Sequence, residues 1–561
     1  MITKLALKPT RSRRTPAWCY DCHVMLMSRH IQQFRAGVWL TLLASCLGMA
    51  GCGPGLASGG EEGAEGSSED AGGSEDASGG TGQGVPPEPP QGLSLTPAPT
   101  KRFIFEWEAV PGAQEYQLLE QVDPEGEFVA VGPSTGDPEQ TLIVPLHLRA
   151  GARYRVRACN PWGCADSDSV EAIAPLADAI GYLKHPDPWE QDQFGWVRAM
   201  TRDGSTIFVT TQNETLAYAW SDETGWKSSP ELFPPMGVAA IDGDGDTVVS
   251  GAQGLDGGIG VYTRQGEEWI EEAQIGPLSD PPGYYRSYDL DDEGDTLAIC
   301  YDGHIFDPVD VCGVAERVAP GQWEVAELLE IQPGGGHVVL SGSGETLALC
   351  TGGRVRVHAR DPMGGWPLQA ELAPEVLPES AHCKNMAINY SGEVIVTGTD
   401  QENSDADGIN GDPNDDSAVT AGAAWVFERG PGEEWSQRAY LKAINSSSAD
   451  YFGWDVAIDD AGDLIAVSAF REGTGNFGVT QPNGQSVESS GAVYLFERDA
   501  LGEWAHRSYL KAPNPGVNDR FGWHLNMSGD GQLLLASAPY EDSDAGQKDD
   551  SMLNAGALYS F

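Results

Sequence analysis

The sequence predicts an all-β fold, and three observations support this prediction. Gly accounts for 71 of the 561 residues, about twice its usual share of ~7%. Hydrophobic residues still make up 40% of the chain, so most of it is expected to be globular. Apolar and polar residues alternate in short runs that end at Gly, Asp or Asn, which is typical of short strands joined by tight turns.

The net charge excludes one class of partner. The chain carries 84 Asp and Glu against 33 Lys and Arg, a formal charge of -51. Nucleic-acid binding depends on Lys and Arg that displace counterions from phosphates, so we expect no nucleic-acid partner. Seven of the bases and one acid lie in residues 1–51, which leaves 26 bases and 83 acids, or -57, in the rest of the chain.

Residues 1–51 are predicted to be a leader that contains a lipoprotein signal peptide. Arg29 and Arg35 precede the apolar run 36–50, which is too short to span a bilayer and has the length of a signal-peptide core. The run ends in small residues before Cys52, and this resembles the lipobox of bacterial lipoprotein precursors. The resemblance implies lipidation of Cys52 and a place on the bacterial outer membrane or cell surface. An ordinary secretory signal with an incidental cysteine is the alternative.

A haem-attachment pattern lies upstream of this signal. Cys19, Cys22 and His23 form C-x-x-C-H, the sequence to which a c-type haem is attached. Haem attachment takes place on the exported side, whereas these residues precede the signal and would be removed with it. We therefore expect no haem.

Residues 52–91 are predicted to be a disordered acidic tether. They are rich in Gly, Ser and Glu, contain almost no apolar residues and end in a Pro-rich stretch. A tether directly after Cys52 fits a chain that is fixed to a membrane by a lipid anchor.

Residues 92–175 are predicted to form a β-sandwich. Runs with period 2 surround Trp107, the pair Tyr116 and Leu118, and the pair Tyr154 and Val156. An early Trp, a Gly-Ala-x-x-Tyr-x-Leu strand and a late Tyr-x-Val-x-Ala strand resemble a fibronectin type III domain.

Residues 179–561 contain an internal repeat whose marker is a turn built around Gly followed by an apolar strand. The seven marker glycines are Gly204, Gly245, Gly294, Gly344, Gly392, Gly462 and Gly531. Their spacings of 41, 49, 50, 48, 70 and 69 residues fit one four-stranded blade each, with about 20 extra loop residues in two blades. The repeat therefore predicts a seven-bladed β-propeller.

The end of the repeat predicts how the ring closes. The chain stops after the third strand of the last repeat, and residues 181–184 copy the fourth-strand sequences 439–442 and 508–511. We expect residues 179–185 to pair with the C-terminal strand, because closure removes free sheet edges.

The repeats also resemble a known family. Phe-Gly-Trp opens three blades, at Phe194, Phe452 and Phe521, and second strands end in Ser-Gly-Ala or Ser-Ala. These elements are similar to the FG-GAP repeats of integrin alpha subunits and of bacterial integrin-like propellers. Blades two to four lack the Phe-Gly element.

The resemblance raises the question of Ca²⁺, which such repeats hold in Asp-rich loops. In the loop 400–417 the candidate ligands are Asp405, Asp407, Asn410 and Asp412. A solvated acidic loop is the alternative. Two weaker candidates are the alternating acids of a tight hairpin (Asp242, Asp244 and Asp246) and those of the last loop (Asp542, Asp544, Asp549 and Asp550).

The cysteines after the signal fit an exported protein, in which thiols oxidise. Cys159 and Cys164 bracket a Pro and a Gly, so a hairpin would bring them together. Cys300 with Cys312 and Cys350 with Cys383 are further candidate disulfides, although sequence does not establish connectivity. A metal site that uses His304 or His382 would lack any recognised ligand spacing.

The sequence favours a non-catalytic function. We find no H-E-x-x-H, no G-x-S-x-G and no phosphate-binding loop. The favoured interpretation is a cell-surface lipoprotein that recognises a protein or a glycan through the loops of its propeller. The alternatives are an envelope scaffold without a discrete ligand and a hydrolase that uses the propeller channel.

Overall fold

The chain divides into two units, Met1–Thr81 and Gly82–Phe561, and only the second is described here. The computed structural model describes residues 84–561 except for 212–213, 223, 230–237, 252–257, 267, 277, 279–283, 303–310, 330, 332–335, 375–382, 384 and 544–550. The predicted leader, Cys52 and most of the predicted tether therefore lie outside the described residues, as do Asp544, Asp549, Asp550, His304 and His382.

Two antiparallel sheets precede the repeats. The first has the strand order β1 (Ser94–Ala98), β2 (Arg102–Glu106), β5 (Glu139–Ile143). The second has the order β4 (Val129–Thr135), β3 (Glu115–Gln121), β6 (Arg153–Asn160), β7 (Gly163–Asp166), and β8 (Val170–Glu171) pairs with β6. Alternate residues of β2, β3 and β6 are fully buried in one shared core, which contains Phe103, Phe105, Leu118, Tyr154 and Val156. Between β5 and β6 lies the short helix α1 (Leu146–Arg149).

Seven further antiparallel sheets follow in chain order, and we number them as blades 1 to 7. Blade 1 comprises β10 (Trp196–Met200), β11 (Thr206–Thr210), β12 (Thr215–Ser221) and β13 (Gly225–Ser229), and blade 2 comprises β14 (Val238–Ile241), β15 (Thr247–Gly251), β16 (Ile259–Gln265) and β17 (Glu268–Ile275). Blade 3 comprises β18 (Tyr284–Leu290), β19 (Thr296–Asp302), β20 (Val311–Ala319) and β21 (Gln322–Leu329). Blade 4 comprises β22 (His337–Leu340), β23 (Thr346–Thr351), β24 (Arg354–Ala359) and β25 (Leu368–Leu372). Blade 5 comprises β26 (Asn385–Ile388), β27 (Val394–Thr399), β28 (Ala423–Arg429) and β29 (Trp435–Leu441). Blade 6 comprises β30 (Phe452–Ile458), β31 (Leu464–Ala469), β33 (Ala492–Arg498) and β34 (Trp504–Lys511), and the short β32 (Gly478–Thr480) lies beside β34. Blade 7 comprises β35 (Leu525–Met527), β36 (Leu534–Ala538), β37 (Ala557–Ser560) and β9 (Gly181–Leu183).

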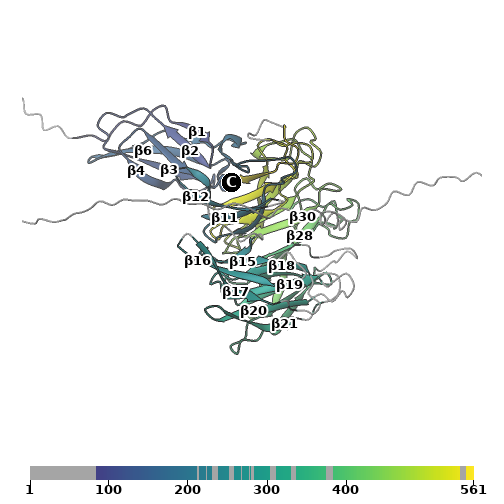
Figure 1. Cartoon of the computed structure of the whole chain (residues 1–561). Coiled ribbons are helices and arrows are strands. Elements are labelled where there is room, and N and C mark those ends of the chain that lie inside the picture. Colours follow the sequence, from purple (N-terminus) through teal and green to yellow (C-terminus); the bar gives the residue numbers. More distant parts are fainter. Residues whose placement is uncertain are drawn as a thin grey trace, which may run out of the picture. The chain divides into compact units, whose positions relative to one another are not determined.

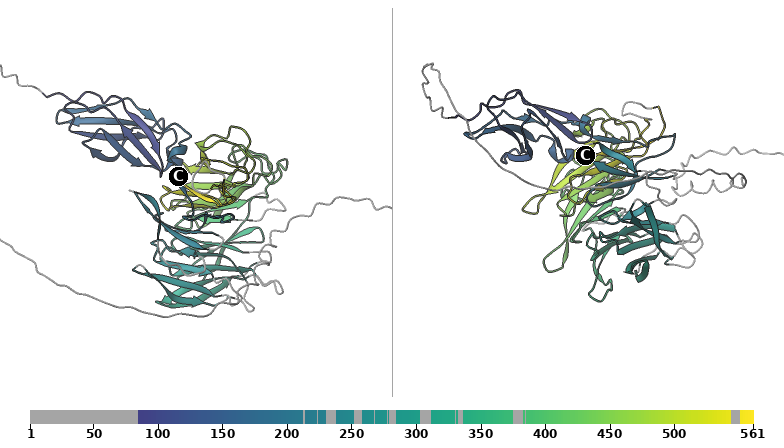
Figure 2. Two further views of the ribbon diagram at one scale, coloured as in Figure 1. Left: turned by 45° about the horizontal axis from the view of Figure 1, so that its top comes forward. Right: turned by 60° about the vertical axis from the view of Figure 1, so that its left-hand side comes forward.

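The blades form a closed ring. The first strand of each blade contacts the first strand of the next, and β35 of blade 7 contacts β10 of blade 1. In blade 7 the fourth strand is β9, which pairs antiparallel with β37 so that Tyr182 lies opposite Tyr559. In Figure 1 the C-terminus accordingly lies beside the blue strands β11 and β12, and Figure 2 shows the sheets from two further directions. This is the arrangement of a β-propeller, and the predicted all-β fold is confirmed.

Side-chain hydrogen bonds explain the repeated turn between the first and second strands. Thr201, Asp242, Asp291, Ser341, Asn389, Asp459 and Ser528 each begin such a turn and accept a backbone N–H four or five residues later with a side-chain oxygen. The marker glycine between them has φ between 66° and 83°, a left-handed conformation that glycine adopts without strain. The recurring Gly marker of the sequence thus serves the turn itself.

The Phe-Gly element joins consecutive blades. The backbone N–H of Phe452 donates to Ala421 at 2.8 Å, and Phe521 and Phe194 make the same contact with Ser490 and Ala555. At Gly453 an added Cβ would lie 2.1 Å from the carbonyl oxygen of Ala423, so the two backbones touch. Each contact is made by the end of a long loop of the preceding blade. The connections between the second and third strands of blades 1 to 4 are shorter, and the blades that follow them, 2 to 5, do not begin with Phe-Gly.

We expect Gly453→Ala to destabilise the propeller much more than Gly408→Ala. Both glycines have positive φ, 81° and 76°, so both variants incur the backbone strain of roughly 1–2 kcal/mol. Only at Gly453 does the new Cβ collide with backbone, because nothing lies within 4 Å of a Cβ at Gly408. Denaturant unfolding of the two variants measures the difference, and equal losses would contradict a close contact between blades.

Candidate functional site

The strand order sorts the connections onto two faces of the ring. Because neighbouring strands are antiparallel, the connections between first and second and between third and fourth strands lie at one end, here the turn face. The connections between second and third strands and from blade to blade lie at the other end, the loop face. The three long connections 400–422, 470–491 and 539–556 of blades 5 to 7 therefore all belong to the loop face.

A buried ion pair anchors the first of these loops. The Nζ of Lys442 lies 2.7 Å from Oε2 of Glu402, and both side chains are almost fully excluded from solvent. The same Nζ donates to the carbonyl oxygens of Ser404 at 2.6 Å and Gly422 at 2.7 Å, so all three of its protons are used. The ion pair thus joins the outer strand of blade 5 to both ends of the loop.

The same anchor recurs in blades 6 and 7. Lys511 contacts Glu472 at 2.9 Å, and Lys184 contacts Glu541 at 2.8 Å. A tyrosine two residues before each lysine donates to the same glutamate, Tyr509 at 2.9 Å and Tyr182 at 3.1 Å. The repeated Tyr-Leu-Lys strands are evident in the sequence, whereas their glutamate partners were not predicted. All three glutamates stand in a shared Glu-x-Ser/Thr pattern at the start of a loop, which could have revealed them.

An aromatic cluster lies on the loop face where blades 6 and 7 meet. The rings of Trp454, Phe470 and Trp523 have centroids 4.3 to 4.9 Å apart. Tyr451 packs on Phe470 at 5.4 Å, and Tyr540 packs on Trp523 at 5.5 Å. Trp454, Tyr451 and Tyr540 are partly exposed, so the cluster has an accessible surface.

The structure does not bring the predicted Ca²⁺ ligands of loop 400–417 to one point. Asp405, Asp407 and Asp412 do not place carboxylate oxygens within 4.8 Å of one another. Asp407 accepts the N–H of Ser446, Asp412 that of Asn414, and Asn410 that of Tyr440. The loop is ordered by these local hydrogen bonds and by Lys442.

Among the described residues, the acids that do converge are Asp242, Asp244 and Asp246, which each place an oxygen within 4.8 Å of the others. Their charge suits a divalent cation. However, Asp242 Oδ1 already accepts the N–H groups of Gly245 and Asp246, and Asp244 also accepts that of Asp246. Burial raises the pKa of Asp242 to about 6, which the charges of its two neighbours reinforce. An Asp triad that could hold a metal is therefore present, and turn formation accounts for most of its geometry.

On the turn face, one arginine crosses the ring. Arg202 of blade 1 contacts Asp460 of blade 6 at 2.6 Å and Asp292 of blade 3 at 3.1 Å. Its guanidinium also lies 3.8 Å from the ring centroid of Tyr390 in blade 5. Gly342 leaves room for this cluster, since a Cβ there would lie 2.5 Å from Tyr390. The turn-face end of the central axis is thus occupied by side chains.

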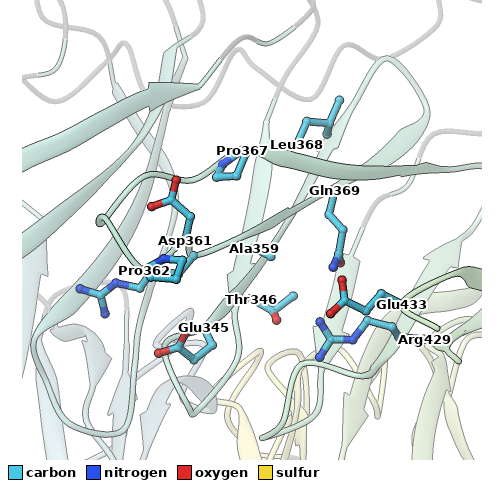
Figure 3. Close-up of a pocket in the computed structure, with 11 residues that line it drawn as sticks. Glu345, Thr346, Ala359, Asp361, Pro362, Pro367, Leu368, Gln369, Arg429 and Glu433 are labelled. Carbon is cyan, nitrogen blue, oxygen red and sulfur yellow. The ribbon is translucent and has the colours of Figure 1, made fainter. Parts of the chain in front are cut away.

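The turn face also carries an open pocket of about 490 Å³ between the outer hairpins of blades 4 and 5. Figure 3 shows Asp361 and Pro362 on one side of it and Gln369, Arg429 and Glu433 on the other. Two of its polar side chains already have partners: Gln369 accepts from Trp435, and Asp361 accepts from two backbone N–H groups. We regard it as a gap between hairpins.

The six candidate cysteines lie in pairs. Disulfides join Cys159 with Cys164 between β6 and β7, Cys300 with Cys312 between β19 and β20, and Cys350 at β23 with Cys383 just before β26 of the next blade. The last one links two blades.

In the part of the chain that the structure describes, no helix is long and apolar enough to cross a membrane.

Removing the anchor lysine should be costly. We expect Lys442→Met to lower the free energy of unfolding by about 3–5 kcal/mol, because Glu402 is left buried and unpaired. The double variant Lys442→Met, Glu402→Gln should recover part of this loss, since no charge is then buried. Chemical denaturation measures both; a double variant no more stable than the single one would show that the ion pair is not the cause.

Asp450 should make stability depend on pH. Burial raises its pKa to about 7, which the charge of Glu472 reinforces and that of Lys511 opposes. The folded state therefore retains a proton that the unfolded state loses, and stability falls as pH rises from about 4 to 7. We expect Asp450→Asn to match the wild type at pH 4 and to exceed it by roughly 2–4 kcal/mol at pH 8. The exposed Asp416→Asn is the control, and parallel pH profiles for wild type and Asp450→Asn would refute the assignment.

A comparison with known protein families finds one match, in a segment that spans blades 5 and 6. Residues 435–496 match the model of the FG-GAP repeat. No curated protein sequence matches the chain. The segment runs from β29 of blade 5 to β33 of blade 6, and it includes the Phe452-Gly453 element and the contact between these blades.

Several solved structures are similar to the chain at low identity. The β-propeller domain of Cps50 (Swd1) from Myceliophteria thermophila matches with 12% identity and a TM-score of 0.43, over 68% of this chain and 98% of that one. U3-55K matches with 16% identity and a TM-score of 0.41, over 68% and 98%. A putative 6-phosphogluconolactonase from Bacteroides fragilis matches with 12% identity and a TM-score of 0.37, over 72% and 97%. The FG-GAP assignment does not depend on these matches: the chain contains an FG-GAP repeat region within a β-propeller-like fold.

Proposed function

We propose that the protein is a non-catalytic recognition protein whose loop face binds a protein or a glycan. The observation that carries this proposal is that blades 5 to 7 each extend a long loop on the same face and fix it with a buried Lys–Glu pair. Loops that are ordered before binding lose little conformational entropy when a ligand docks. The partly exposed aromatic cluster at their base supplies the contact surface that such sites use.

The side chains that cross the axis favour recognition over a hydrolase that uses the channel. Arg202 joins blades 1, 3, 5 and 6 at the turn face. A substrate would therefore enter and leave from the loop face alone. A scaffold without a discrete ligand would not need three separately anchored loops on that face.

The remaining parts of the chain suit a surface protein. We infer that residues 92–175 form a fibronectin type III-like sandwich, since their strands divide into sheets β1-β2-β5 and β4-β3-β6-β7 around one core. It packs on the propeller: the fully buried His147 lies 2.9 Å from the carbonyl oxygen of Gly531, and Ser508 donates to the His147 carbonyl.

Lipidation at Cys52 and the acidic tether would then hold the propeller away from an outer membrane. Any Ca²⁺ would be held by Asp242, Asp244 and Asp246.

Capture of the full chain by surface fractions of neighbouring or host cells tests this proposal. Three exposed apolar side chains of the loop face, Val419, Val517 and Leu553, are changed together to Ser. The control changes Met363 and Leu501, which are 93% and 87% exposed on the turn face. We expect the loop-face variant to lose capture at least tenfold and the control to retain it. Capture that neither variant affects, or that only the control loses, would reject the loop face as the site.

A further inference from the structure

Two arginines lie over the aromatic cluster of the loop face. The guanidinium of Arg520 lies 4.4 Å from the ring centroid of Tyr540, 5.2 Å from that of Trp523 and 5.9 Å from that of Phe470. Arg471 lies 5.0 Å from Tyr451 and 5.6 Å from Phe470. Both cations therefore lie within 6 Å of the ring centroid of Phe470, and stacking on aromatic rings holds them in place.

Neither guanidinium has an anionic partner among the described residues. The Nε atoms of Arg471 and Arg520 are buried and have no hydrogen-bond acceptor. Other arginines of these blades behave differently: Arg498 contacts Glu428 and Asp463, and Arg507 contacts Glu497. Two unpaired cations are unexpected in a chain with 84 acids and a charge of -51.

The acids beside these arginines are engaged elsewhere. Glu472 follows Arg471 in sequence, but its carboxylate binds Lys511 and Tyr509. Asp519 precedes Arg520 and accepts the N–H of Gly516 at 2.6 Å. Asp450 is buried, and Arg471 meets it only through a backbone hydrogen bond, from the N–H of Arg471 to the Asp450 carbonyl. The fold therefore keeps the two guanidiniums free of neighbouring carboxylates.

We propose that Arg471, Arg520 and the aromatic rings around them bind the carboxylate of an acidic sugar. A guanidinium whose face is stacked on a ring still offers its N–H edge, which matches a carboxylate with two parallel hydrogen bonds. The partly exposed rings of Tyr451 and Tyr540 stand beside the two cations and offer apolar faces to the C–H groups of a sugar ring. This inference rests on the proposed recognition function and names the ligand class of the same face.

The experiment titrates the full chain with a uronic-acid oligosaccharide and, as a matched probe, with the same oligosaccharide methyl-esterified at every carboxyl group. Binding is followed by calorimetry and by the total tryptophan fluorescence of the chain, to which Trp454 and Trp523 of the cluster contribute. The variants are Arg471→Gln and Arg520→Gln. Arg438→Gln removes the same charge from a half-exposed position on β29 that pairs with Glu428 and serves as the control.

We expect the acid to bind, the ester to bind at least tenfold more weakly, and each cluster variant to lose about tenfold in affinity while Arg438→Gln stays within twofold. Melting temperatures near that of the wild type show that the variants are folded; if one unfolds, Arg471→Lys and Arg520→Lys keep the charge and should still bind more weakly. No binding of the acid, equal binding of acid and ester, or equal affinity in the cluster variants would overturn the proposal.

The capture experiment separates this inference from the proposed function. If the loop-face variant loses capture but the chain does not distinguish acid from ester, the face recognises a ligand of another class and only the acidic-sugar assignment is wrong. If neither surface fractions nor sugars bind, both proposals are wrong.

Discussion

The close approach of backbone between consecutive blades constrains the rest of the propeller. Between blades 5 and 6, Gly422 and Gly453 each face a carbonyl oxygen of the other blade at a distance that no Cβ would allow. Gly491 and Gly556 make the equivalent approach to Phe521 and Phe194. The end of each long loop therefore has to lie against the start of the next blade, and this fixes where the loops can lie on the loop face.

The buried lysines also hold the long loops in place. A long loop without a hydrophobic run has little apolar surface with which to order itself. Lys442 supplies the missing order through one carboxylate and two carbonyl oxygens, and it removes the desolvation cost of an unpaired Glu402 at the same time. Because the three anchors belong to neighbouring blades, they place three loops and the aromatic cluster between them on one rigid surface.

The acidic charge of the chain has several separate structural roles. Asp242, Asp291 and Asp459 accept backbone hydrogen bonds in the blade turns, while Glu402 and Glu472 anchor loops. Asp292 and Asp460 hold Arg202 across the axis. Against this background Arg471 and Arg520 are unusual, because the abundant carboxylates nearby are already committed to other partners.

The sequence alone determined the β-propeller fold and its FG-GAP repeat, because these depend on local rules: alternation of apolar residues, a turn that needs Gly at one position, and a strand sequence that recurs at regular spacing. It also indicated acids in the loops, favouring Asp405, Asp407, Asn410 and Asp412 with Asp242, Asp244 and Asp246 as a weaker candidate, whereas among the described residues the tertiary structure brings together the carboxylates of the weaker candidate. In the long loop each acid meets a nearby backbone N–H first, and sequence spacing does not reveal that competition. The contacts of Lys442 with Glu402, of Arg202 with Asp460 and of Arg520 with Phe470 join residues 40, 258 and 50 positions apart. Only the tertiary structure decides such pairs. The first forms within blade 5, where the long loop folds back on the outer strand, and the other two form where separate blades meet, so local sequence rules reveal none of them.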